Sequence, residues 1–150
     1  MAVTIGDASA QYLDSLYDIE MECFEKEAFT KQQIAYLLTD YNSISLVAKL
    51  KDEIVGFIIG RIYVERKSLA GHILTIDVSP VHRRKGIATR LLQEIERIFK
   101  EKGVGVCHLE VREDNVAALR LYQKSGYRII GRLKNYYEHA NGVYLKKVLT

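Results

Sequence analysis

The sequence is poor in the features that mark several classes of protein. It has only two cysteines, Cys23 and Cys107, which show neither a CxxC motif nor the spacing of metal ligands. A disulfide-stapled secreted fold and a cysteine-based metal centre are therefore disfavoured. We expect two reduced thiols packed in the core and no metal site.

Long apolar runs are also missing. The best candidate for a membrane span stays short of the roughly 18 residues required. It is interrupted by Lys49, Lys51, Asp52, Glu53 and Arg61. The first residues, MAVTIGDASAQYLD, lack the basic and apolar regions of a signal peptide. These absences predict a cytoplasmic protein without a membrane partner.

The chain has a single proline, Pro80, and no linker, low-complexity tract or internal repeat. Its 150 residues, 48% of them hydrophobic and 27% charged, predict one globular domain over residues 1–150. The net charge of +3 is mild. It does not by itself indicate a nucleic-acid partner, and it fits an anionic ligand equally well.

The hydrophobic pattern predicts strands interleaved with helices. Helices are expected over residues 11–24, 30–39, 86–102 and 115–125, and strands over residues 2–5, 43–50, 53–64, 71–78, 104–112, 127–133 and 142–149. Thr30 and Gln33 have the spacing of a capping box, and ERKSLA at 65–70 is expected to be a mobile loop. The order predicts an α/β fold with a central mixed, mostly antiparallel sheet of about seven strands, flanked by four helices.

The entrance of the third helix, SPVHRRKGIATRLL, is unusual. Arg83, Arg84 and Lys85 stand at a helix N-terminus that already carries partial positive charge, without a good capping residue. A phosphate or pyrophosphate held on the backbone N–H groups would explain this, and Gly86 would let it approach closely. A basic patch for nucleic acid is the alternative. The missing cap, the glycine and the preceding strand favour the phosphate site.

At this point the sequence resembles a known family. RRKGIA matches the R/Q-x-x-G-x-G/A signature of the GCN5-related N-acetyltransferases (GNAT). TIDVSPVHRRKGIATRLL, LEVREDNVAALRLYQKSGY and KNYYEHANGVYLKKVL resemble consecutive motifs of its RimI-like branch. That branch includes the bacterial ribosomal-protein alanine acetyltransferases and the archaeal and eukaryotic protein N-terminal acetyltransferases. The resemblance, over nearly the whole chain, implies a GNAT fold that transfers acetyl from acetyl-CoA to an N-terminal α-amine.

The same resemblance implies where acetyl-CoA would bind. Strand backbone at residues 76–78 would pair with the pantetheine, and the turn before the third helix would hold the pyrophosphate. Asn115 or Asp114 is expected to cap the helix that follows, and Asn115 to contact the cofactor as well or instead. Asp77 stands where the branch commonly has a small residue. The implied cofactor-binding residues are Ile76, Asp77, Val78, Arg83, Arg84, Lys85, Gly86, Ile87, Ala88, Thr89, Asn115 and Tyr122.

Three residues are implied to be catalytic. Glu110 would be the general base, because an α-amine with a pKa of about 7.7–8.0 must lose its proton to attack. His72 would help to hold a proton-relay water, and Tyr122 would be the general acid to the CoA thiolate. The alternatives are a structural ion pair of Glu110 with Arg112 or a neighbouring cation, a structural His72 and a Tyr122 that only packs.

Strand alternation places His108, Glu110 and Arg112 on one face, which predicts a wet cleft there. His82 and His108 are expected to be surface or secondary groups. No cysteine falls at a motif position, so direct transfer is favoured over an acyl-enzyme.

On the substrate side, MECFEKEAF resembles the loop that receives the peptide N-terminus, although the prolines and tryptophan common there are missing. Phe24 and Phe29, with Glu25, would wall the pocket or simply pack. Tyr136 and Tyr137 would clamp the peptide backbone or form a strand-end aromatic pair.

Peptide or protein N-termini are the expected substrates, without nucleic acid. Association with a ribosome or an auxiliary subunit is left open. Alternatives are acetylation of lysine side chains or small amines, a non-catalytic acetyl-CoA-binding module and a nucleic-acid binder.

Overall fold

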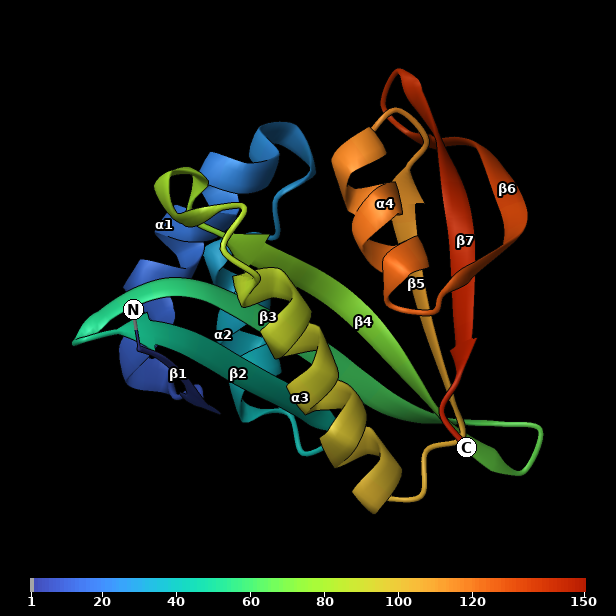
Figure 1. The fold of residues 1–150 in the computed structure, drawn as a ribbon, viewed down its shortest axis with the longest axis horizontal. Coiled ribbons are helices and arrows are strands. Elements are labelled where there is room, and N and C mark those ends of the chain that lie inside the picture. Colours follow the sequence, from blue (N-terminus) through green and yellow to red (C-terminus); the bar gives the residue numbers. More distant parts are fainter. Residues whose placement is uncertain (1) are drawn as a thin grey trace.

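The computed structural model describes residues 2–150 and forms one twisted sheet with helices on both faces (Figure 1). The strands are β1 (Val3–Asp7), β2 (Ser43–Leu50), β3 (Glu53–Glu65), β4 (Ser68–Val78), β5 (Val106–Arg112), β6 (Arg128–Tyr137) and β7 (Ala140–Val148). The α-helices are α1 (Leu13–Phe24), α2 (Lys31–Thr39), α3 (Ile87–Glu101) and α4 (Val116–Lys124). The predicted α/β fold of seven mostly antiparallel strands and four helices is confirmed.

The sheet has the order β1-β2-β3-β4-β5-β7-β6, and only β4 and β5 run parallel. These two strands pair over only three residues each, ending at His72 and His108. Beyond that point they diverge, with α3 beside β4 and α4 beside β5 (Figure 1). The facing edges of β4 and β5 therefore keep backbone groups that do not pair with each other.

A bulge helps β4 to bend away. Ile59 of β3 pairs with Thr75, whereas the next residue, Gly60, pairs with Ile73. Leu74 is thus an extra residue in β4. A residue inserted in this way bends its strand and increases the local twist.

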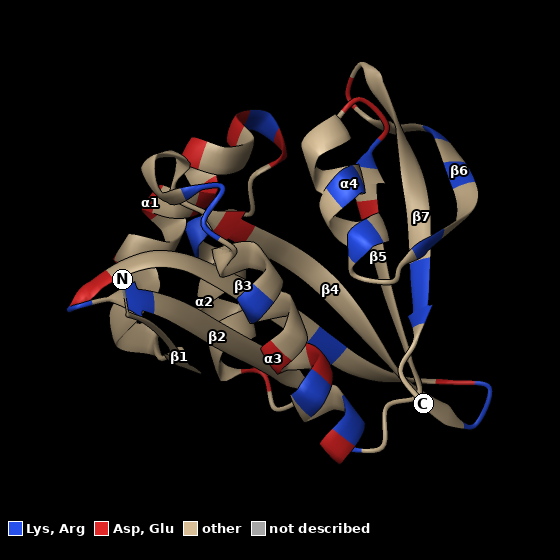
Figure 2. Ribbon diagram, in the orientation of Figure 1, with Lys and Arg blue, Asp and Glu red and all other residues tan. Residues whose placement is uncertain are grey.

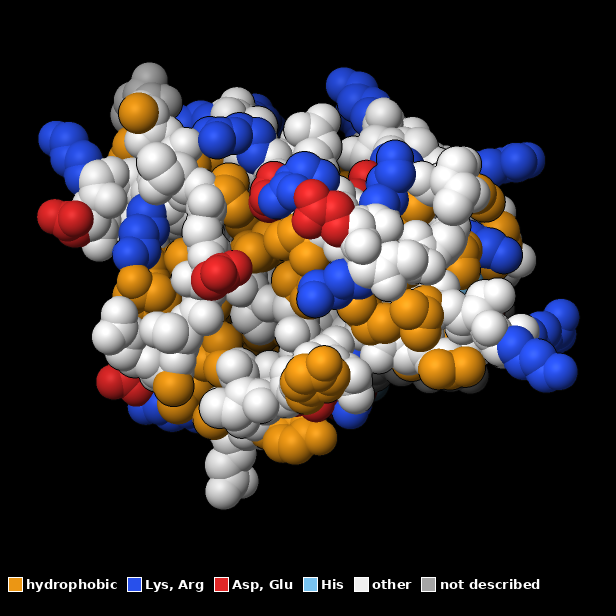
Figure 3. All heavy atoms as spheres, turned by 90° about the horizontal axis from the view of Figure 1, so that it is seen from below, with side chains coloured by type: hydrophobic (Ala, Val, Ile, Leu, Met, Phe, Trp, Pro, Cys, Tyr) orange, Lys and Arg blue, Asp and Glu red, His pale blue; other side chains and the backbone are white. Residues whose placement is uncertain are grey.

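Each face of the sheet has its own apolar core. On one face, α1 and α2 bury Leu16, Ile19, Ile34 and Leu37 against β2 and β3. On the other face, α3 buries the stripe that its sequence predicts. Its Phe99 packs closely over Gly71, where a Cβ atom would lie 2.6 Å from the ring. A space-filling view from below shows charged side chains of both signs scattered among apolar ones (Figure 3).

The helix ends largely follow the sequence signals. Thr30 and Gln33 form the predicted capping box, and the Asn115 side chain accepts a hydrogen bond from the Ala118 N–H, as expected of a cap. Gly103 and Gly126 adopt the left-handed conformation just after α3 and α4. Among residues 2–150, no helix is both long and apolar enough to cross a membrane.

The expected mobile loop at 65–70 is wrong. β3 continues to Glu65 and β4 already begins at Ser68, so only Arg66 and Lys67 form the turn. Both residues have positive φ angles, 49° and 69°, which is the geometry of a tight hairpin turn. The sequence has neither glycine nor asparagine there, so the usual signal is missing. β6 also runs further than expected, to Tyr137.

Candidate active site

The entrance of α3 lies at the end of β4, where β4 and β5 have separated. Gly86 is the N-cap residue with φ 79°, and no side chain caps the helix. The first N–H groups of α3 therefore have no acceptor within the helix. A Cβ atom at Gly86 would meet nothing within 4 Å, so the glycine faces open space. This arrangement of free donors and an open approach fits a pyrophosphate group.

The three basic residues before Gly86 are not equivalent. Arg83 is exposed but bonded to the protein: its Nε donates to the Val78 carbonyl at 3.1 Å, and its guanidinium lies 3.3 Å from the Cys23 sulfur. Arg83 thus joins the turn to β4 and α1. Arg84 and Lys85 are exposed, and neither has an ion pair within residues 2–150. The basic turn lies beside the acidic end of α1 in Figure 2.

Two predicted catalytic residues meet at the point where β4 and β5 begin to separate. His72 Nε2 lies 2.7 Å from Glu110 Oε1, and the two side chains are 32% and 18% exposed. The alternative ion pair of Glu110 with Arg112 is not formed. Arg112 instead contacts Asp114 at 3.0 Å and Glu27 at 2.5 Å. Glu110 is therefore paired with the His72 ring and not with Arg112.

Tyr122 lies on the inner side of α4. Its ring packs edge-on against Tyr127, with 6.0 Å between the centroids. Burial, and then the nearby Asp77, raise the pKa of Tyr122 above its ordinary value. The phenol therefore carries its proton at neutral pH.

Of the two readings of His108, a surface or a secondary group, the structure excludes the surface one. It is 4% exposed, its Nδ1 lies 2.5 Å from the Tyr144 hydroxyl, and the two rings stack at 5.3 Å. Burial lowers the pKa of His108, so the imidazole is neutral near pH 7. The predicted wet face of β5 therefore consists of Glu110 and Arg112, because the Tyr144 ring covers the third position.

Cys23 also differs from the expectation of a core thiol. It is half-buried beside Arg83, whereas Cys107 is fully buried as predicted. Burial raises the pKa of Cys23 to about 11, so its thiol is protonated at neutral pH. Among residues 2–150, no group of histidine, cysteine and acidic side chains is arranged to hold a metal ion.

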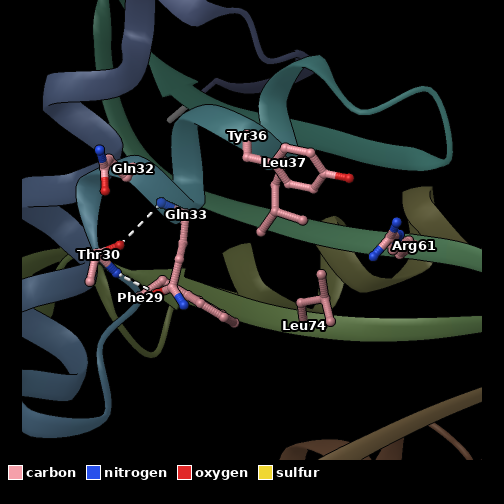
Figure 4. Close-up of a pocket in the computed structure, with 8 residues that line it drawn as sticks. All are labelled: Phe29, Thr30, Gln32, Gln33, Tyr36, Leu37, Arg61 and Leu74. Atoms are coloured by element: carbon pink, nitrogen blue, oxygen red, sulfur yellow. Dashed lines mark hydrogen bonds between the residues drawn. The ribbon is translucent and has the colours of Figure 1, made fainter.

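Two adjoining cavities open on the face that carries His72. One, of about 600 Å³, lies between α2 and the strands β3 and β4. Phe29 lines the end of this cavity beside Thr30 (Figure 4). The other, of about 510 Å³, reaches His72. Arg61 and Leu74 line both cavities and thus connect them. Of the three predicted residues in the α1–α2 segment, only Phe29 lines these cavities; Phe24 and Glu25 do not.

Tyr136 and Tyr137 stand at the end of β6 and pack edge-on, with 4.9 Å between the ring centroids. Tyr136 is 53% exposed, whereas Tyr137 is partly covered by Arg112, 5.8 Å from its ring. Burial raises the pKa of both phenols, and the Glu110 carboxylate adds to this. The pair therefore lies near Glu110, with one ring free to meet a ligand.

Sequence reasoning missed two residues beside this site, Glu20 and Thr75. Both are buried. The Thr75 hydroxyl is within hydrogen-bond distance of the Glu20 carboxyl and of the Asp77 carboxyl. Glu20 follows Leu16 by four residues, so it lies on the apolar side of α1. An acidic residue at that position was the available signal.

The sequence profile of the Acetyltransferase (GNAT) family matches residues 13–127. The chain belongs to the GNAT family. As a GNAT protein it is an acetyl-CoA-dependent N-acetyltransferase, and the uncapped entrance of α3 fits that cosubstrate. Solved structures of GNAT-like fold include one from Thermoplasma acidophilum with coenzyme A bound, at a TM-score of 0.81 and 20% identity over 99% of both chains.

Several relatives of this GNAT chain carry specific names. An N-alpha-acetyltransferase of Sulfurisphaera tokodaii is 35% identical over 72% of the chain and 70% of the relative. N-alpha-acetyltransferase 30 of Schizosaccharomyces pombe is 31% identical over 90% of each. The structure of Ard1 from Thermoplasma volcanium superposes with a TM-score of 0.91 at 28% identity, over 100% of this chain and 99% of that one.

Proposed function

We propose that this GNAT protein transfers acetyl directly from acetyl-CoA to the α-amine of peptide or protein N-termini. The relatives named N-alpha-acetyltransferase support this substrate class, and one of them matches 90% of the chain. The observation that carries the proposal is the 2.7 Å contact between His72 and Glu110 on the partly exposed face beside the tyrosine pair.

Acetyl-CoA supplies an activated acetyl group as a thioester. The free N–H groups of Ile87, Ala88 and Thr89, with Arg84 and Lys85, hold its pyrophosphate at the entrance of α3. The backbone of Ile76, Asp77 and Val78, on the edge of β4 that does not pair with β5, meets the pantetheine as an added strand would. Asn115 caps α4 and borders the cofactor arm from the other side.

Glu110 accepts the proton of the attacking amine, directly or through a water that His72 helps to hold. The amine nitrogen forms a bond to the acetyl carbon, and the carbon–sulfur bond breaks. Tyr122 gives its phenolic proton to the departing thiolate and regains one from solvent. Neither cysteine takes part, because the pKa of each thiol is raised, to about 11 for Cys23 and about 12 for Cys107.

The peptide enters along the cavities beside His72, with Phe29 at the pocket wall. Tyr136, the exposed member of the tyrosine pair, contacts the peptide backbone, and Tyr137 supports it from below. Glu25, exposed at the start of the segment between α1 and α2, and Phe24, partly buried at the end of α1, shape the rim.

The substrate class is tested with labelled acetyl-CoA and short peptides that begin with Ser, Ala, Met-Leu or Met-Glu. A lysine peptide with a blocked N-terminus and spermidine are the comparison amines. Label on the free N-termini alone is expected. Label on the blocked peptide or on spermidine would move the activity to lysine side chains or small amines.

Two variants test the assigned roles. Glu110→Gln should lower turnover about 100-fold while CoA affinity stays unchanged, because only the base is lost. Gly86→Glu should abolish CoA binding, since it adds bulk and negative charge at the open approach with φ 79°. Normal turnover in the first variant, or normal CoA affinity in a folded second variant, would contradict the assignment.

A further inference from the structure

Three buried polar side chains lie under the segment that joins α1 to α2. Glu20 of α1 and Asp77 of β4 are each 1% exposed, and Thr75 of β4 is 7% exposed. The Thr75 hydroxyl lies 2.9 Å from Glu20 Oε1 and 2.6 Å from Asp77 Oδ1. Within residues 2–150, neither carboxyl group has a hydrogen bond or ion pair to a lysine or arginine.

These distances require more protons than the hydroxyl provides. Thr75 has one proton and can donate it to only one of the two carboxyl oxygens. The other contact, if both acids were ionised, would set the Thr75 oxygen against a carboxylate oxygen with no hydrogen between them, in a buried site. One of the two acids therefore carries a proton of its own.

The remaining contacts show which acid that is. Glu20 Oε2 already accepts a hydrogen bond from the Phe29 N–H at 2.9 Å, so Glu20 is surrounded by donors. Asp77 Oδ2 is buried and has no partner among the described residues. Burying a carboxyl oxygen without a hydrogen-bond donor costs far less free energy when the acid is neutral than when it is ionised. Asp77 Oδ1–H thus donates to Thr75, and Thr75 donates to Glu20.

We propose that Glu20 is a positioning residue for the peptide-binding segment, and that a neutral Asp77 keeps the single Thr75 proton directed at Glu20. Glu20 then holds Phe29, which lines the cavity beside α2. When Asp77 ionises, it competes for the Thr75 proton and weakens the support of Glu20. The inference rests on the proposed function, since it concerns the same peptide site.

The groups that face Asp77 agree with this assignment. Burial, followed by the Glu20 carboxylate, raises the pKa of Asp77 well above its ordinary value. From α1 it also faces Cys23, and from α4 Tyr122, and both of these are protonated at neutral pH. Arg83, from the turn before α3, is the one positive group that acts on Asp77 among the described residues, and its Nε and Nη2 donate to Val78 and Cys23 rather than to Asp77.

The kinetic test compares the wild-type protein with Asp77→Asn and Thr75→Val. The asparagine amide can donate to Thr75 as the neutral acid does, but it cannot ionise. For the wild type, the peptide KM should rise about 5-fold or more toward alkaline pH with little change in CoA affinity. Asp77→Asn changes only the side chain and not the backbone assigned to the pantetheine, and in this variant the peptide KM should show no alkaline rise. Thr75→Val should have a raised KM at every pH. An alkaline rise that persists in Asp77→Asn would overturn the proposal.

A second measurement needs no catalysis. The carboxyl carbon of Asp77 is followed by NMR in ¹³C-labelled protein, together with hydrogen exchange at the Phe29 amide. We expect a protonated Asp77 at pH 7 and loss of Phe29 protection as it ionises, with full protection kept in Asp77→Asn. An ionised Asp77 at pH 7 would refute the inference whatever the substrate is. Inactivity toward every free peptide N-terminus, with the expected NMR result, would refute only the proposed function.

Discussion

Two buried glutamates, Glu20 and Glu96, lie on helices that cover opposite faces of the sheet, and they are held in opposite ways. Glu96 of α3 accepts hydrogen bonds from Lys147 at 2.7 Å and from the Tyr127 hydroxyl at 2.8 Å. Glu20 of α1 has no cation beside it and shares a hydroxyl with a second acid. A buried carboxylate with its own cation is a fixed structural element. An acid pair without a cation must hold a proton, so its hydrogen bonds depend on pH.

The largest effect is expected when the Glu96 group loses its cation. Lys147→Met leaves a buried carboxylate without a positive partner, which should lower the free energy of unfolding by about 2–4 kcal/mol. Urea denaturation at neutral pH measures this. The control is Lys147→Met combined with Glu96→Gln, which should recover much of the loss. The peptide KM of the folded variant should stay unchanged. A raised KM would mean that the Glu96 group also supports the peptide site, and would contradict the difference drawn between the two groups.

A smaller loss of stability is expected from Thr75→Val, which removes the hydroxyl between the two acids. The isosteric change leaves Glu20 and Asp77 without their shared partner and should cost about 1–3 kcal/mol. Here the peptide KM should rise as well, because Phe29 loses its support. Stability loss with an unaltered KM would make this group as purely structural as the Glu96 group.

The pH dependence of stability separates the two groups further. The folded state binds the Asp77 proton more tightly than the unfolded state does, so this contribution is complete below its ordinary pKa of 3.8. It is lost as the pH rises toward the higher folded-state pKa. Asp77→Asn should therefore be more stable than the wild type at pH 8, with no gain at pH 4. Denaturation curves at both pH values measure this. The same difference in stability between variant and wild type at pH 8 and at pH 4 would contradict it.

The smallest effect should come from His108, whose pKa is shifted in the other sense. Burial lowers the folded-state pKa of His108, so stability is lost as the pH falls below its ordinary value of 6.5. His108→Gln keeps an acceptor for the Tyr144 hydroxyl but cannot take a proton. Between pH 7 and pH 5 the variant should lose less stability than the wild type, by about 1 kcal/mol or less. Thermal denaturation at both pH values measures it.

Much of the fold could be predicted because its signals are local. The apolar stripe of α3, the capping box at Thr30 and the glycines after α3 and α4 each act within one or two turns. The turn at Arg66 and Lys67 was missed because it has no such local signal. Its conformation is fixed by the long β3–β4 pairing around it rather than by the residues of the turn.

The site was predictable only in part. The entrance of α3 breaks local rules of capping and charge, so the sequence marks it directly. The pairing of His72 with Glu110 depends on how β4 and β5 lie, which no local pattern shows. The Glu20 group joins residues that are 55 positions apart, and His108 is buried by a tyrosine 36 positions away. Such contacts depend on tertiary packing.

The most direct test of the proposed activity uses one peptide that carries both a free N-terminal α-amine and an internal lysine. The protein acetylates it from acetyl-CoA, and fragmentation mass spectrometry locates the acetyl group. We predict acetyl on the α-amine alone, with the signal lost in Glu110→Gln and kept in Glu96→Gln. Acetyl on the lysine, with the N-terminus left free, would contradict the proposed function.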